Sequence, residues 1–106
     1  MLGAPDACEG AAADLFDYAL ATARAGDYPA AEVIYKRIDA KFPTTKEGDF
    51  ARYKIGYMAF DKGELERART ELHAYATGRP DGLHVDEAWW FAGRAAWRSE
   101  IGRAHV

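Results

Sequence analysis

The chain has 106 residues, of which 49% are apolar, 29% charged and 13% aromatic, and its formal net charge is −3. This length allows one modest core, and the aromatic content argues against disorder, so we expect a soluble folded domain. Mildly acidic, interspersed charges exclude a nucleic-acid partner, and no apolar run approaches the roughly 20 residues that a transmembrane helix needs.

Residues 1–10 are interpreted as a leader or as a fragment of a preceding element. Cys8 is the only cysteine, so it cannot form an internal disulfide or a cysteine metal site. The segment lacks the basic and apolar regions of a signal peptide, and the residues before Cys8 do not resemble a lipoprotein signal. We therefore expect a free thiol near a frayed terminus.

The remaining sequence predicts helices, because apolar residues recur at helical spacing and no segment alternates with period two. Gly26 can take the left-handed conformation that ends a helix, and Pro43 stops the next one. Thr44 and Glu47 have the spacing of a capping box. The predicted helices run from about Ala11 to Ala25, from Tyr28 to Phe42, from Thr44 to Gly63, from Glu64 to Thr77, and from about Val85 onward.

An internal repeat is visible when the sequence is shifted by 37 residues, which superposes glycines, prolines and small residues. Because two helices approach closely only where side chains are short, the recurring small residues predict a helix contact rather than mere helix propensity. The superposed sets are Gly26 with Gly63, Ala31 with Ala68, Pro43 with Pro80, and Ala19 with Gly56 and Gly93.

The repeat divides the chain into residues 11–43, residues 44–80, and a first helix of a third unit at 81–100. After residue 100 the register fails. Residues 100–106 also match what one reading frame of a common sequencing adapter encodes, so we interpret 101–106 as a non-native tail. A divergent native terminus is the alternative.

This pattern resembles the tetratricopeptide repeat, in its 53–56 segment (Tyr-Lys-Ile-Gly) and its 26–28 segment (Gly-Asp-Tyr). The family's small residue, bulky residue and closing proline match Ala31, Tyr35 and Pro43, then Ala68, Leu72 and Pro80. A unit longer than the usual of about 34 residues is similar to bacterial cell-envelope members. These members include the Tol-Pal accessory protein, lipoproteins of outer-membrane assembly, and the superhelical arm of soluble lytic murein transglycosylases.

The resemblance implies an all-α fold, a right-handed α-solenoid of antiparallel helix pairs with about two and a half repeats. It also implies a fragment of a longer protein of the periplasm or cell envelope. Enzyme motifs are absent: Ser99 has no nucleophile elbow around it, and no glycine-rich phosphate loop occurs. His73, His84 and His105 match no metal-ligand spacing, so we expect no catalysis, no cofactor and no metal.

A stripe of aromatic and arginine residues is the best candidate site, because the first helices of this family line the concave face. The alternative is that these rings are core between neighbouring helices. Trp89 is expected to be the buried ring beside them. Because arginines outnumber acids on the stripe, we expect a neutral to acidic ligand. The candidate ligand-binding residues are Tyr53, Tyr57, Trp90, Arg94 and Arg98.

Two functions follow from these observations. The first is a non-catalytic module that binds a protein or peptide segment in a scaffold or cell-envelope protein. The alternative is the superhelical arm of a lytic transglycosylase whose catalytic domain lies outside this sequence. We also expect self-association through the apolar fifth helix, which no later helix covers.

Overall fold

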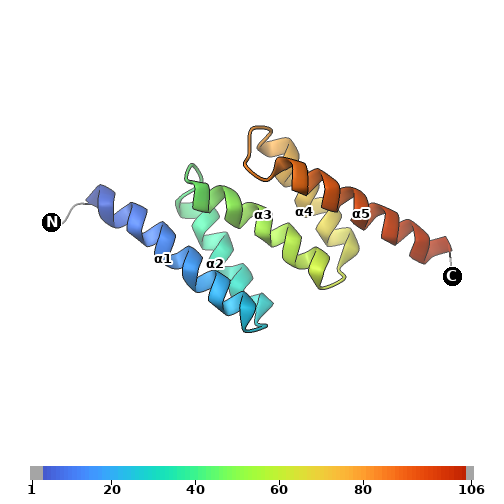
Figure 1. The fold of residues 1–106 in the computed structure, drawn as a ribbon, viewed down its shortest axis with the longest axis horizontal. Coiled ribbons are helices and arrows are strands. Elements are labelled where there is room, and N and C mark those ends of the chain that lie inside the picture. The colour runs from blue at the N-terminus through green and yellow to red at the C-terminus, as the bar shows by residue number, and fades with distance from the viewer. Residues whose placement is uncertain (1–3, 105–106) are drawn as a thin grey trace. The chain divides into compact units, whose positions relative to one another are not determined.

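The computed structural model describes residues 4–104, with side chains for 10–102, so residues 1–3 and 105–106, His105 among them, lie outside the description. Within that range all regular structure is helical, which confirms the all-α class; the solenoid arrangement stays a prediction. Among the described residues, no helix combines the length and apolar character needed to cross a membrane. The helices (Figure 1) are α1 (Ala4–Arg24), α2 (Tyr28–Lys41), α3 (Lys46–Asp61), α4 (Leu65–Gly78) and α5 (Val85–Ala104).

The chain divides into two compact units, residues 1–52 and 53–106, and the division falls inside α3. This differs from the single core that the chain length predicts. In the first unit α1 packs against α2, and in the second α4 packs against α5. Each unit is therefore built from helices that are neighbours in the sequence.

Both ends of the helical region extend beyond the predicted bounds. α1 begins at Ala4 rather than Ala11, because Pro5 is tolerated in a first turn and the following residues include many alanines. Cys8 therefore falls within α1, although its side chain lies outside the described residues. α5 continues to Ala104, and the non-native origin of 101–106 stays a prediction.

The same type of turn follows α1 and α3. Gly26 and Gly63 have φ of +93° and +82°, the left-handed conformation that the sequence predicts. In each case the amide after the glycine donates to a carbonyl in the last turn of the helix. These bonds join Asp27 N–H to Thr22 C=O (3.1 Å) and Glu64 N–H to Ala59 C=O (2.9 Å).

The capping at the start of α3 differs from the predicted capping box. The capping side chain is Thr45, not Thr44, and its Oγ1 accepts a hydrogen bond from Gly48 N–H (3.0 Å). The same hydroxyl donates to Phe42 C=O (2.7 Å) and ties α3 to the end of α2. The reciprocal carboxylate bond of a capping box cannot form, because the residue three positions after Thr45 is a glycine.

The predicted small-residue contact is confirmed at Gly56, where a Cβ would lie 2.8 Å from Leu72 Cγ and Cδ2, so α3 and α4 approach closely there. Ala19, at the equivalent position of α1, is fully buried. Gly93 contradicts the prediction, because it is exposed and a Cβ there would meet nothing within 4 Å. The core positions of the second helices also correspond, with full burial of Ala31, Tyr35 and Ile38 and of Ala68 and Leu72.

Candidate interaction surface

The five predicted site residues lie in the second unit, two on α3 and three on α5. Trp90 is 57% exposed, whereas Tyr53 is only 6% exposed. Tyr57 and Arg94 are half-buried, and Arg98 is exposed. Four of the five side chains therefore reach the surface, and Tyr53 does not offer its ring to a ligand in this conformation.

Phe91 is the ring that joins α3 to α5. Its centroid lies 5.2 Å from that of Tyr57 and 5.0 Å from that of Phe60, both on α3. Trp90, the preceding residue on α5, stands edge-on to Phe91 at 4.9 Å. Edge-to-face pairs at these separations add to the stabilisation that apolar burial provides, so this cluster fixes the helix face that carries Trp90.

Three cations lie over rings of this cluster. The Arg94 guanidinium carbon is 5.1 Å from the Trp90 centroid, and that of Arg98 is 4.9 Å from the Phe60 centroid. Lys54 Nζ is 4.8 Å from the Tyr57 centroid. At exposed sites each such contact contributes about 0.5–1 kcal/mol. We call this the cation–aromatic surface: Lys54, Tyr57, Phe60, Trp90, Phe91, Arg94 and Arg98.

Arg94 has one atom whose hydrogen-bonding capacity is not used. Its Nε is buried, and within the described part of the chain it has no hydrogen-bond partner. A buried donor without an acceptor costs free energy, and this atom is covered, so it is a local cost of the fold rather than a contact offered to a ligand.

Tyr53 is a buried ring that packs against this surface. Its ring stacks on Tyr57 (6.1 Å) and His84 (5.1 Å) and meets Tyr75 of α4 edge-on (5.9 Å). Burial raises the pKa of Tyr53 well above its usual value, and the negative charge of Glu87 adds to the shift. The ring therefore positions Tyr57 rather than contacting a ligand.

The prediction that Trp89 is a core ring is wrong. Trp89 is 47% exposed. Its ring meets the His73 ring of α4 edge-on, with 5.3 Å between the two centroids. The buried face of α5 is formed instead by Ala88, Ala92 and Ala95. Trp89 lies off that face, because successive helical residues are about 100° apart.

The candidate residues from the sequence include four members of this surface, Tyr57, Trp90, Arg94 and Arg98, and leave out Lys54, Phe60 and Phe91. Lys54 was not singled out, although its spacing of three residues from Tyr57 places both on one helix face. Phe91 was not among the candidate residues either. Its role as the ring between α3 and α5 depends on which helices become neighbours, and no local pattern gives that.

The segment between α4 and α5 is anchored on one hydroxyl. Tyr75 Oη accepts a hydrogen bond from His84 N–H (3.1 Å). A Cβ on Gly82 would collide with the same phenol, so only glycine allows the chain to pass this close. His84 lies directly before α5, and His73 is exposed on α4. This anchoring sets where α5 begins.

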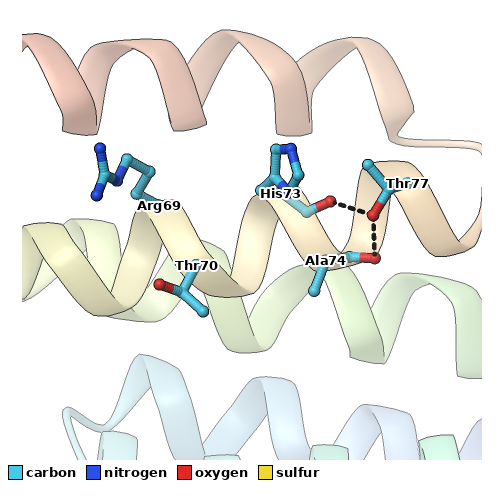
Figure 2. Close-up of a pocket in the computed structure, with 5 residues that line it drawn as sticks. All are labelled: Arg69, Thr70, His73, Ala74 and Thr77. Carbon is cyan, nitrogen blue, oxygen red and sulfur yellow. Dashed lines mark hydrogen bonds between the residues drawn. The ribbon is translucent and has the colours of Figure 1, made fainter.

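A hollow of about 550 Å³ lies along one face of α4 (Figure 2). Arg69 and His73 extend from it toward α5, and Thr77 Oγ1 donates to His73 C=O (2.9 Å). The Arg69 guanidinium pairs with Glu66 (3.0 Å), whose other oxygen accepts from Ser99 Oγ of α5 (2.7 Å). The polar groups here hold α4 to itself and to α5.

Among the described residues, no group of three or more His, Cys, Asp or Glu side chains is arranged to hold a metal ion. Comparison with protein-family models, with curated proteins and with solved structures finds no match to this chain. We therefore infer a function from the residues of the cation–aromatic surface.

Proposed function

We propose that this chain is a non-catalytic helical repeat module that binds a protein segment on the cation–aromatic surface. The observation that supports the proposal best is Trp90, which is 57% exposed and has the Arg94 guanidinium across its ring. An exposed tryptophan held rigidly beside arginine is the residue combination that dominates binding energy at protein interfaces. The resemblance to cell-envelope repeat proteins suggests the periplasm or cell envelope as its compartment.

The chemistry of this surface favours a neutral to acidic segment. Arg94 and Arg98 supply planar donors suited to carboxylates and backbone carbonyls, and Lys54 adds a third positive charge. The rings provide contact area with few torsions to immobilise, which keeps the entropic cost of binding low. Specificity would then come from the placement of an acidic group relative to an apolar side chain.

A phage-displayed peptide library tests this function. We expect selection on the full chain to enrich peptides that combine acidic and apolar residues. Trp90→Ala should weaken the affinity of the enriched peptides about 30-fold, which corresponds to about 2 kcal/mol. Arg37→Gln, at an exposed position of α2 in the first unit, is the control and should leave the affinity unchanged.

Two outcomes would contradict the proposal. The first is a selection that enriches no sequence over an unrelated helical protein. The second is a set of peptides that bind Trp90→Ala and the parent equally well while circular dichroism shows both proteins folded.

A further inference from the structure

We draw no further inference here: the strongest candidate, the exposed apolar face of α5 formed by Trp90, Trp97 and Ile101, is a surface patch for which nothing in the structure shows what covers it.

Discussion

Tyr35 shows how one polar atom in a core shapes stability. The side chain is fully buried, and its hydroxyl has no hydrogen-bond partner in the part of the chain that the structure describes. The position that matches it in the next repeat is Leu72, which is equally buried and has no polar atom. The hydroxyl is therefore tolerated rather than required.

Tyr35 should make the protein sensitive to alkaline pH. Burial raises the pKa of Tyr35 to about 12, from 10.0 in the unfolded chain. The unfolded state loses this proton first, so the stabilisation is complete below about pH 10 and is lost as pH rises toward 12. The expected loss is about 2–3 kcal/mol.

The check is urea denaturation of the parent and of Tyr35→Phe on both sides of this pH window. We expect the variant to be about 1 kcal/mol more stable at neutral pH, because the unsatisfied hydroxyl is removed. Its alkaline loss should be smaller, with the rest due to Tyr53, whose pKa burial also raises. A variant that is markedly less stable than the parent at neutral pH would contradict this account.

Asp27 and Glu64 are equivalent positions with nearly the same backbone angles, yet only the shorter side chain caps its helix. Asp27 accepts from Ala30 N–H (3.2 Å), whereas Glu64 makes no capping bond and pairs with Lys62 and Arg67 at 3.4 Å. Exposed pairs of this kind contribute little.

Glu64→Asp should therefore stabilise the protein by about 0.5–1 kcal/mol, because it adds a cap at the start of α4. Thermal melts of this variant, with Asp27→Glu as the reciprocal control, provide the measurement. Asp27→Glu should lower the melting temperature. The reasoning fails if both changes shift the melting temperature in the same direction.

Glycines have opposite roles in different helices of this fold. A Cβ on Gly48 would run into the Phe42 carbonyl oxygen at the α2–α3 turn, a backbone atom that cannot rotate away. Gly93 is exposed in the middle of α5 with open space around it. The same substitution should therefore have opposite signs at the two sites.

Gly48→Ala is expected to destabilise by about 1–3 kcal/mol, because α3 must move away from Phe42. Gly93→Ala should stabilise by about 0.5–1 kcal/mol through helix propensity. Chemical denaturation of the two variants beside the parent measures both effects. Similar free energies of unfolding for the pair would refute the assignment of close contact at Gly48.

Among the described residues, the exposed large apolar side chains are concentrated on one helix. Tyr18, Val33 and Leu83 are isolated from one another in the sequence, whereas Trp89, Trp90, Trp97 and Ile101 all lie on α5. Trp90, Trp97 and Ile101 share one side of that helix. Isolated exposed apolar residues are ordinary, but a group on one helix face is typical of an interaction site.

The sequence by itself determined the helices, their glycine turns at Gly26 and Gly63, and the small-residue contact at Ala19 and Gly56. These signals are local or recur at a fixed spacing, and backbone conformation responds to them directly. Four of the seven residues of the cation–aromatic surface were predicted for the same reason, since helical spacing places Trp90 and Arg94, and likewise Arg94 and Arg98, on a common face.

The tertiary structure decided which faces are covered. Tyr53 and Trp90 occupy equivalent sequence positions, yet only the first is buried, because α4 packs on α3 at that face and no described residue lies within 4 Å of the matching Gly93 position on α5. Trp89, placed in the core from sequence, is half-exposed for a related reason. Burial depends on the neighbour that a helix meets, and a repeating pattern specifies the contact without specifying whether a partner is present.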